Sequence, residues 1–327
     1  MKENAMTIFF LGWTAQYEQR MVHHLAASHD VTMLVAPKWM KRVGRYLNSF
    51  SKGRNRPTRG HHWLADQLMK PHKVKHDDIL ICNEGQFRRG LNPAIVERFK
   101  GHKVLMVRDL VTASFIDALR PRFDKLYSFD KAQCEALGLD YLNQFFPFGF
   151  DEALRLAEQS GDNRTAPTCF FLGRDKGRTA LVESVAQVLE KNGCQVDFHL
   201  VPDSTSLPAS RFYIDDVLPY AENIRRSMAA DILLEINQPG QAGITLRTLE
   251  AAYFNKRLIT NNASVKSLDI YRPENIYVIE DNDFSGLADF LGGQPVRLNH
   301  EALYGYSPEA MIQHVIQDMR PTHSHNA

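Results

Sequence analysis

Two apolar stretches that end in glycine decide the fold class of this chain: Thr7–Gly12 (TIFFLG) and Thr168–Gly173 (TCFFLG). Neither contains a charged residue, and a stretch with helical periodicity follows each of them. Such a run is typical of a strand that is buried on both faces, as in a parallel sheet. The two runs therefore indicate the starts of two α/β domains. They are too short to indicate a duplication, because buried first strands of such domains resemble one another.

Strand and helix patterns alternate through both halves of the sequence. The expected strands are 7–12, 31–36, 78–83, 103–108, 125–129, 168–172, 196–201, 231–236, 257–260 and 276–279. The expected helices between and after them are 15–28, 62–70, 93–100, 112–119, 131–137, 178–192, 213–228, 244–254 and 308–319. This alternation predicts parallel sheets that are covered by helices on both faces.

We therefore expect two Rossmann-like, doubly wound domains that face an interdomain cleft. The predicted domains are 1–155 and 156–327, joined through the polar stretch 158–164, and the last helix is expected to pack back on the first domain. In such sheets ligands bind at the carboxyl ends of the strands, so functional residues are sought there.

Composition excludes several classes of protein. The 327 residues carry 39 Lys and Arg against 38 Asp and Glu, a net charge of +1, which excludes a protein that coats nucleic acid. The four cysteines form no C-x-x-C pair, so we expect reduced thiols and no zinc site. No signal peptide or apolar span of membrane length is present in the sequence, and we expect a cytoplasmic protein.

The loop after Thr168–Gly173 has the composition of a phosphate site. Gly173, Arg174, Lys176 and Arg178 lie in a short, glycine-bounded segment that leads into a helix. Backbone N–H groups at a helix start attract an anion, and cationic side chains neutralise it. Neither a Walker A loop nor a G-x-G-x-x-G pattern is present, which disfavours ATP hydrolysis and dinucleotide binding. A solvated, basic helix start remains the alternative.

A second loop, between the expected strand 231–236 and the helix 244–254, carries two glycines that let the backbone approach a ligand. Its candidate ligand residues are Gln241, Gly243, Thr245 and Arg247. Glu250 lies about two turns into the helix, where its carboxylate could accept hydrogen bonds from ribose hydroxyls. By position alone, Glu250 is an ordinary surface residue of a helix.

These strings carry a resemblance. Gly243–Ala251, followed by Leu258–Asn262, resembles the donor-nucleotide region of GT-B glycosyltransferases. Phe171–Arg178, Gly240–Arg247 and Leu258–Asn262 more narrowly resemble bacterial lipopolysaccharide or outer-core transferases. The resemblance implies two Rossmann-like domains and a nucleotide-sugar held by the second, without a cofactor or a metal ion. It implies that Arg174, Lys176 and Arg178 face the diphosphate, that Gly243 and Thr245 line it, and that Glu250 holds the ribose. Many retaining members carry a Glu at the position of Ala242, so the stereochemical outcome is not carried over.

An inverting transfer needs a carboxylate or a histidine that takes the proton of the acceptor hydroxyl. Two acids follow predicted strands of the first domain, Glu84 and Asp109, and we prefer Asp109 as the base; a loop or helix-cap role is the alternative. Asp281-Asn282-Asp283 spells the D-x-D metal motif of a different transferase class, but its late position indicates a turn.

The segment 38–60 contains eight basic residues and no acidic one. Trp39, Val43, Leu47 and Phe50 recur in it at helical spacing, which predicts an amphipathic helix suited to an anionic membrane surface. The cations expected at the membrane, or at phosphates of a lipid-linked acceptor, are Lys38, Lys41, Arg42 and Arg45. A mobile solvated loop is the alternative, and RNA binding is disfavoured because the excess is confined to one segment.

From these features we expect a metal-independent glycosyltransferase. It would move a sugar from a nucleotide-sugar to a glycolipid or oligosaccharide of the lipopolysaccharide type, at the cytoplasmic face of the inner membrane. Two alternatives remain open: a sugar-nucleotide epimerase or hydrolase of the same fold, and a two-lobed binding protein without catalytic activity.

Overall fold

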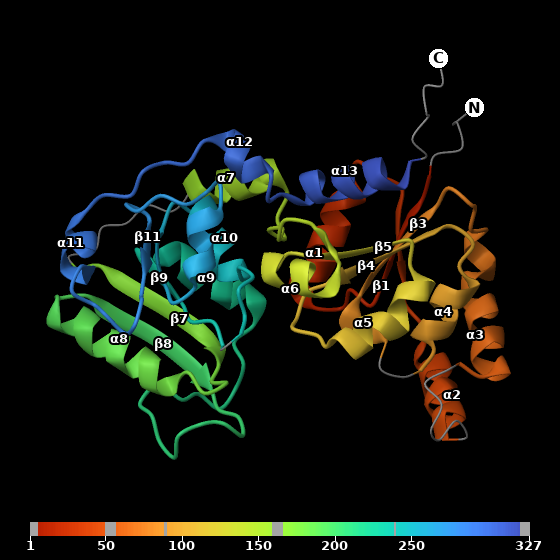
Figure 1. Ribbon diagram of the computed structural model, residues 1–327, viewed down its shortest axis with the longest axis horizontal. Coiled ribbons are helices and arrows are strands. Elements are labelled where there is room, and N and C mark those ends of the chain that lie inside the picture. Colours follow the sequence, from red (N-terminus) through yellow and green to blue (C-terminus); the bar gives the residue numbers. More distant parts are fainter. Residues whose placement is uncertain (1–5, 50–56, 88–89, 159–165, 239, 321–327) are drawn as a thin grey trace. The chain divides into compact units, whose positions relative to one another are not determined.

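The computed structural model describes residues 6–49, 57–87, 90–158, 166–238 and 240–320, and it divides the chain into two units (Figure 1). The first unit comprises Met1–Asn143 together with Ile312–Ala327, and the second is Gln144–Met311. We expected the boundary at residue 155. Most of the predicted polar join, from residue 159 to 164, lies outside the described residues.

The first unit is built on a six-stranded sheet with the order β2-β1-β3-β4-β5-β6, in which every pair is parallel. The strands are β1 Ile8–Leu11, β2 Val31–Leu34, β3 Ile79–Asn83, β4 His102–Val107, β5 Lys125–Ser128 and β6 Asp140–Tyr141. The five strands predicted for this half are confirmed, and the short edge strand β6 was not predicted. It is too brief and too polar to give a strand pattern.

The helices of the first unit follow the strands as expected. They are α1 Gln16–Leu25, α2 Lys38–Ser49, α3 Arg59–Met69, α4 Asn92–Arg98, α5 Ala113–Leu119 and α6 Lys131–Leu137. The division between the units falls within the last helix, α13 (Pro308–Met319). In its part that belongs to the first unit, Asp318 accepts a 2.6 Å hydrogen bond from the Tyr127 hydroxyl of β5.

The second unit contains a five-stranded parallel sheet with the order β11-β10-β9-β7-β8. Its strands are β7 Thr168–Arg174, β8 Gln195–Val201, β9 Ile232–Glu235, β10 Arg257–Thr260 and β11 Ile276–Val278, and its helices are α7 Phe150–Glu158, α8 Thr179–Lys191, α9 Tyr220–Ala229, α10 Leu246–Tyr253, α11 Leu287–Gly292 and α12 His300–Tyr304. All five predicted strands are present, and α7, α11 and α12 were not predicted.

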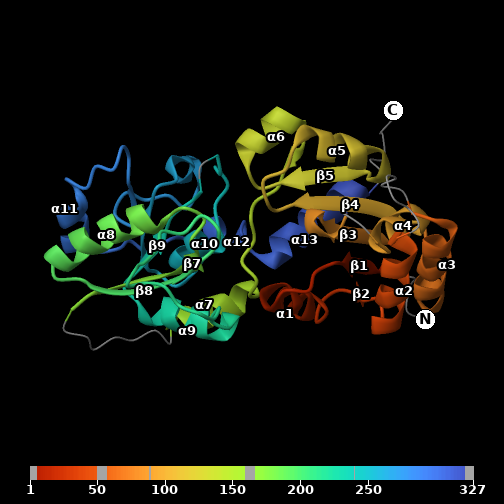
Figure 2. The ribbon, with the colours of Figure 1, turned by 90° about the horizontal axis from the view of Figure 1, so that it is seen from below.

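Strand β7 shows why its apolar run was informative. Phe170 packs into one hydrophobic cluster, with residues of α9 and α10, whereas its neighbour Phe171 packs into another, with residues of α8. Figure 2 shows α8 on one side of this sheet and α7 and α9 on the other. Successive side chains of a strand point to opposite faces, so a strand covered on both sides needs an unbroken apolar sequence.

Each sheet has a switch point, where the chain builds strands outward in both directions. In the first unit it lies between β1 and β3, and in the second between β7 and β9. The loops at the carboxyl ends of strands diverge there, which makes the switch point the usual ligand site of an open α/β sheet. Of the described helices, none has the length and apolar character required to cross a bilayer.

The four cysteines are free thiols in the interior, two in each unit. Cys82 lies on β3 and Cys169 on β7, and burial raises the pKa of both thiols well above the ordinary value. Burial also raises the pKa of Cys194 to about 11.

Candidate functional site

A pocket of about 480 Å³ lies at the carboxyl ends of β7, β9 and β10, at the switch point of the second sheet. This volume falls in the range of small-molecule sites. Amide and hydroxyl side chains dominate its lining: Asn237, Gln238, Gln241, Asn261, Asn262 and Ser264, with Arg178 as the cation. Amides both donate and accept hydrogen bonds, so this lining suits a nucleoside, whose base and ribose offer groups of both kinds.

Three asparagines fix the loops around this pocket. The Asn237 amide N–H donates to Asn261 Oδ1 at 2.7 Å, and Asn261 Nδ2 donates back to the Asn237 carbonyl at 3.1 Å. Asn262 Nδ2 donates to the carbonyl of Ala242 at 3.1 Å, which ties β10 to the loop after β9. Asn237 Nδ2 spans the same loop by donating to the carbonyls of Gln241 and Gly243. The pocket is therefore held by side-chain hydrogen bonds that join two strands.

One of these asparagines has unused hydrogen-bonding capacity. Asn237 is only 5% exposed, and its Oδ1 has no hydrogen-bond partner among the residues that the structure describes. A buried carbonyl oxygen without a donor is costly, about 1–3 kcal/mol. A ligand N–H or hydroxyl that reached this atom would remove that cost, so Asn237 favours a ligand with a donor group.

Arg178 is the predicted diphosphate residue that the structure places in this pocket. Its guanidinium donates to the backbone carbonyls of Arg174, Asp175 and Ile236 and lies 5.5 Å from the Phe171 ring centroid. Carbonyls orient the guanidinium without neutralising its charge, which leaves the positive charge available to an anion. The pKa of Arg178 is lowered by burial, against the attraction of Asp175, Asp203 and Glu235, but a guanidinium stays protonated at neutral pH.

Gly173 makes this placement of Arg178 possible. A Cβ atom built at Gly173 would lie 2.9 Å from Arg178 Nη2. The glycine therefore gives room to the guanidinium, whereas we expected it to be part of the diphosphate-binding loop itself.

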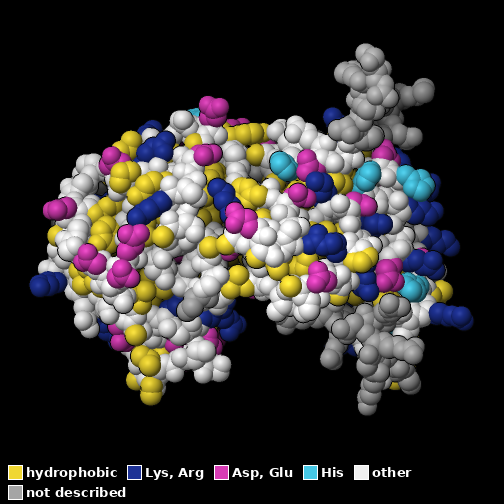
Figure 3. Space-filling model, in the orientation of Figure 1, with side chains coloured by type: hydrophobic (Ala, Val, Ile, Leu, Met, Phe, Trp, Pro, Cys, Tyr) yellow, Lys and Arg dark blue, Asp and Glu magenta, His cyan; other side chains and the backbone are white. Residues whose placement is uncertain are grey.

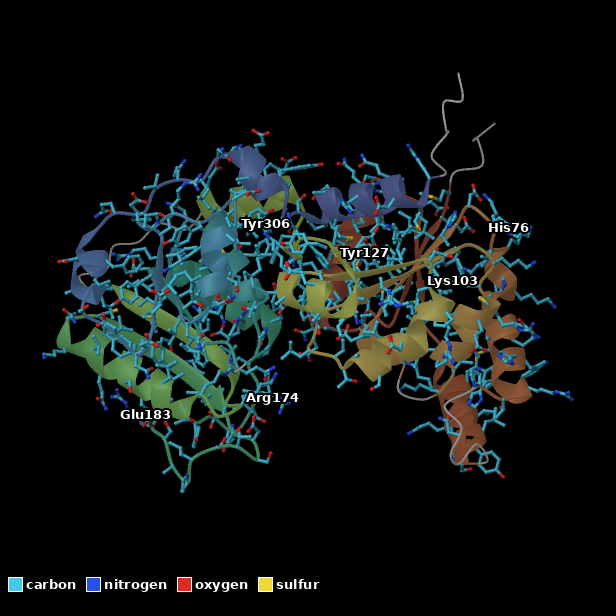
Figure 4. The ribbon with its side chains drawn as sticks, in the orientation of Figure 1. His76, Lys103, Tyr127, Arg174, Glu183 and Tyr306 are labelled. Carbon is cyan, nitrogen blue, oxygen red and sulfur yellow. The ribbon has the colours of Figure 1, made fainter. Side chains whose placement is uncertain are left out.

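Arg174 and Lys176 lie on the same loop but do not line the pocket. Both are exposed, and Figure 4 labels Arg174 at the end of β7. Lys176 adopts a φ of 47°, and its amide N–H donates to Asp203 Oδ2. The two cations flank the pocket as surface residues, so any contact with a ligand needs the long side chains to reach it.

The expectation that amides at the start of α8 bind an anion needs a correction. Asp175 Oδ1 already accepts hydrogen bonds from the N–H groups of Arg178 and Thr179, each at 2.9 Å. Burial favours a raised pKa for Asp175, but hydrogen bonds from Thr179, Ser206 and Tyr213 hold the pKa below its usual range. The protein thus supplies its own anion for these two amides.

The residues predicted from the second loop divide into two groups. Gln241 lines the pocket, and Gly243 is buried with its carbonyl bonded to Asn237. Thr245 caps α10 by accepting from the Arg247 amide, and its hydroxyl donates to Glu235 Oε1 at 2.6 Å. Its hydroxyl is therefore engaged inside the protein, and it was expected to face a ligand.

Arg247 and Glu250 are likewise internal, which corrects the ribose role expected for Glu250. Glu250 is 2% exposed; its carboxylate accepts from Asn223, Ser227 and the Arg247 guanidinium, and it does not line the pocket. Burial raises the pKa of Glu250, and the Arg247 charge opposes that shift. These side chains hold α9 against α10.

Glu235, at the end of β9, is a buried carboxylate that the sequence did not single out. It accepts hydrogen bonds from the hydroxyls of Thr245, Thr248 and Thr260 at 2.6–2.9 Å. It thereby ties the start of α10 to β9 and β10, immediately below the pocket loop. Asn237 was also not singled out as a site residue; its position directly after β9 was the available signal.

The first unit has a larger pocket, of about 800 Å³, at the carboxyl ends of β1 and β2. Apolar residues of the strand ends, with Leu91, form one part of its lining. Lys41, Arg45 and Asn48 of α2 form another part. No described carboxylate pairs with Lys41 or Arg45, so the pocket is suited to an anionic ligand with some apolar surface. Lys38 and Arg42 are exposed and do not line it.

The two candidate bases of the first unit have different surroundings. Glu84 follows β3, is half-buried, and accepts a 2.9 Å hydrogen bond from the Arg108 amide. Burial raises the pKa of Glu84, against the hydrogen bond and charge of Arg108. Asp109 follows β4 and is exposed, with Oδ1 accepting from the Leu110 amide. A carboxylate with a raised pKa is the better proton acceptor, so Glu84 stays a candidate base beside our first choice, Asp109.

The late D-x-D segment forms a turn, as predicted. Asp281 and Asn282 have φ values of 52° and 57°, and Asp283 accepts hydrogen bonds from Ser285.

Comparison with solved structures shows the fold of the whole chain. An α,α-trehalose-6-phosphate synthase from Burkholderia multivorans covers 97% of this chain and 96% of its own, with a TM-score of 0.58 and 11% identity. The UDP-forming synthase from Burkholderia xenovorans, in complex with glucose-6-phosphate, covers 96% and 100%, with a TM-score of 0.60 and 12% identity. The catalytic domain of starch synthase IV from Arabidopsis thaliana, bound to ADP and acarbose, covers 98% and 96%, with a TM-score of 0.53 and 10% identity.

No protein-family model matches the sequence, and a search of curated proteins found no match. The similarity to the solved structures, together with the two parallel sheets, shows that the chain has the GT-B fold of these glycosyltransferases, with two Rossmann-like α/β domains, as predicted.

Proposed function

We propose that this protein is a glycosyltransferase that moves a sugar from a nucleotide-sugar donor to an anionic acceptor. The observation that carries the proposal is the amide-lined pocket at the switch point of the second sheet, with Arg178 at its edge. The fold supports it, because solved structures with the same fold are named as a UDP-forming synthase and as an ADP-bound starch synthase.

The donor site follows from the chemistry of the pocket. The asparagine and glutamine side chains would bind the base and the ribose, with Asn237 Oδ1 taking a donor from the ligand. The Arg178 guanidinium would stabilise the negative charge that develops on the diphosphate as the sugar leaves. Arg174 and Lys176 are close enough in sequence to add their charges when their side chains turn to the diphosphate.

The acceptor site is the pocket of the first unit. Its Lys41 and Arg45 would bind a phosphate or carboxylate, and its apolar wall would contact a sugar ring or an alkyl chain. Glu84, with its raised pKa, would take the proton of the attacking hydroxyl if the reaction inverts configuration. A phosphorylated glycolipid or oligosaccharide of the lipopolysaccharide type has the required charge. Such an acceptor places the enzyme on the cytoplasmic face of a membrane.

Isothermal titration with UDP, GDP, CMP and dTDP tests the donor site directly. We expect one of them to bind, and we expect the double variant Arg174→Ala/Lys176→Ala to weaken binding roughly tenfold, since each exposed ionic contact contributes up to about 1 kcal/mol. Gln241→Ala should weaken the same nucleotide. Lys191→Ala, at the far end of α8, is the matched control and should bind as the wild type does.

Two outcomes would contradict the proposal. Failure of a folded sample to bind any nucleotide would remove the donor site. Consumption of the nucleotide-sugar at the same rate with and without phosphorylated acceptor, without a glycosylated product, would instead indicate a hydrolase or an epimerase.

A further inference from the structure

We propose that α2 is a docking surface for an anionic lipid bilayer. Its Trp39, Val43 and Tyr46 side chains enter the interface, and its Lys38 and Arg42 side chains bind lipid phosphates. This inference rests on exposure and charge in the first unit alone, so it holds whichever nucleotide the second unit binds.

The apolar flank of α2 is exposed to an unusual degree. Trp39 is 52% exposed, Val43 39% and Tyr46 66%. Their spacing of i, i+4 and i+7 places the three side chains on one side of the helix. Clustered large apolar side chains on a surface mark an interaction site, whereas scattered ones do not.

The other flanks of α2 already have partners. Met40 is buried, the Gly44 carbonyl lies 3.0 Å from His61 Nε2 of α3, and a Cβ at Gly60 would lie 2.8 Å from Leu47 Cδ1. Lys41 and Arg45 lie on the flank that lines the pocket. Trp39 and Val43 lie on the remaining flank of α2, where both side chains are exposed. Phe50, which the sequence pattern added to this flank, lies outside the described residues.

The charge around this flank indicates an anionic partner. Residues 31–65 include no Asp or Glu, and Lys38 and Arg42 lie on α2 directly beside the apolar side chains. In Figure 3, Lys and Arg side chains are concentrated at the end of the first unit that carries α3, the neighbour of α2. Aromatic and aliphatic side chains beside cations, on one convex helix, match an interface of apolar chains under anionic headgroups.

The cations of α2 form one side of the helix, because Lys38, Arg42 and Arg45 are spaced at i, i+4 and i+7. Lys38 and Arg42 contact headgroups, and Arg45 on the same side lines the pocket together with Lys41. An anionic group of a membrane lipid would thus be presented next to the pocket of the first unit.

Flotation with lipid vesicles tests the docking surface with the full-length protein. We expect it to float with vesicles of phosphatidylglycerol and phosphatidylcholine in equal parts, and not with phosphatidylcholine alone. Raising the salt concentration should release it, because screening weakens the headgroup contacts. A folded wild-type protein that does not float with the anionic vesicles would overturn the proposal.

Variants distinguish insertion of the apolar side chains into the bilayer from general electrostatic attraction to it. Trp39→Ser/Val43→Ser should reduce vesicle binding at least fivefold and leave transfer to a soluble acceptor unchanged. Lys38→Glu/Arg42→Glu should reduce vesicle binding roughly tenfold or more. The matched controls lie in the second unit: Leu207→Ser/Val217→Ser replaces exposed apolar residues, and Lys191→Glu reverses an exposed charge. Equal loss in the control variants would refute a specific docking surface.

Tryptophan fluorescence gives a readout that does not depend on flotation. Trp13 is fully buried, so in a Trp63→Phe background Trp39 is the exposed indole. Its emission should shift to shorter wavelength on anionic vesicles, and brominated lipid should quench it. Absence of both changes would overturn the insertion of Trp39. Two other results would also overturn the proposal, because each would assign the flank to another partner. One is a dimer that forms without lipid and that Trp39→Ser dissociates. The other is binding of single-stranded RNA that Trp39→Ser weakens, without any binding to vesicles.

Discussion

Glu84 and Asp109 follow neighbouring strands, and Glu84 is half-buried whereas Asp109 is exposed. Burial raises the pKa of Glu84, so an activity that needs the deprotonated carboxylate should fall on acidification at a pH above the ordinary glutamate value of about 4.3. Glu84→Gln keeps an acceptor for the Arg108 amide but cannot take a proton, and it should lower kcat by roughly 10²–10⁴ with little change in KM. A pH profile of kcat checks both effects.

Asp109→Asn is the control for this prediction. It should retain the acidic limb of the pH profile, because Asp109 is exposed on its loop. If Asp109→Asn abolishes turnover and Glu84→Gln does not, then Asp109 is the base, as the sequence first suggested.

Single residues were the hardest part of the site to predict. Arg247 and Glu250 have residue types and spacing that suit a ligand, but both side chains are spent in the contact between α9 and α10. The sequence predicts which helix a residue belongs to more readily than it predicts which side of that helix is buried. In contrast, Asn237 and Glu235 lie at the end of a buried strand. The Asn237 side-chain N–H donates to the Gly243 carbonyl of the following loop, and the Glu235 carboxylate accepts from the Thr245 hydroxyl.

At the scale of elements, the pairing of β3 with β4 depends on a glycine. A Cβ at Gly101 would lie 2.1 Å from the carbonyl oxygen of Asp78, the atom that accepts the His102 amide at the start of this pairing. Gly101→Ala must therefore displace backbone, and we expect it to lower the free energy of unfolding by about 1–3 kcal/mol or more. Urea denaturation measures the change.

Gly292→Ala is the matched control, since no atom of the described residues lies within 4 Å of a Cβ built there. It should leave stability unchanged or raise it slightly, because alanine restricts the unfolded chain. Equal midpoints for wild type and Gly101→Ala would contradict the steric argument.

Elements were predicted well wherever burial imposes a pattern. The ten predicted strands are present because strands covered on both faces must be apolar throughout. The short elements β6, α11 and α12 were not predicted, because they cover the edges and ends of the sheets and have too few residues to show a period. The pattern at 39–50 predicted a helix and α2 confirms it, whereas the sequence did not distinguish its pocket flank from its exposed flank.

At the scale of the whole molecule, each unit has its own sheet and its own core. A nucleotide that binds only the second unit should therefore raise the midpoint of one thermal transition. At a hundred times Kd the stabilisation is about 2.7 kcal/mol, which corresponds to roughly 5–10 °C for a unit of this size. Differential scanning calorimetry with and without the nucleotide checks this. Identical melting midpoints with and without each nucleotide tested would contradict the prediction.

The fold class of the whole chain followed from the two strand–glycine runs, and the boundary between the units did not. The last helix explains the difference, because the division falls within α13 and the final segment of the chain belongs with the first unit. The last helix was expected to pack back on the first domain, and the hydrogen bond of Tyr127 with Asp318 joins the end of α13 to β5 of the first unit. The exact point of division depends on such tertiary contacts.

The interior thiols give each half of the protein its own reporter. Cys82 and Cys134 belong to the first unit, and Cys169 and Cys194 to the second. A thiol reagent modifies a thiolate, and these sulfurs are both sheltered and reluctant to ionise. Modification therefore requires local opening of the surrounding core. Thiol labelling that is resolved by peptide would measure the opening rate of each unit separately.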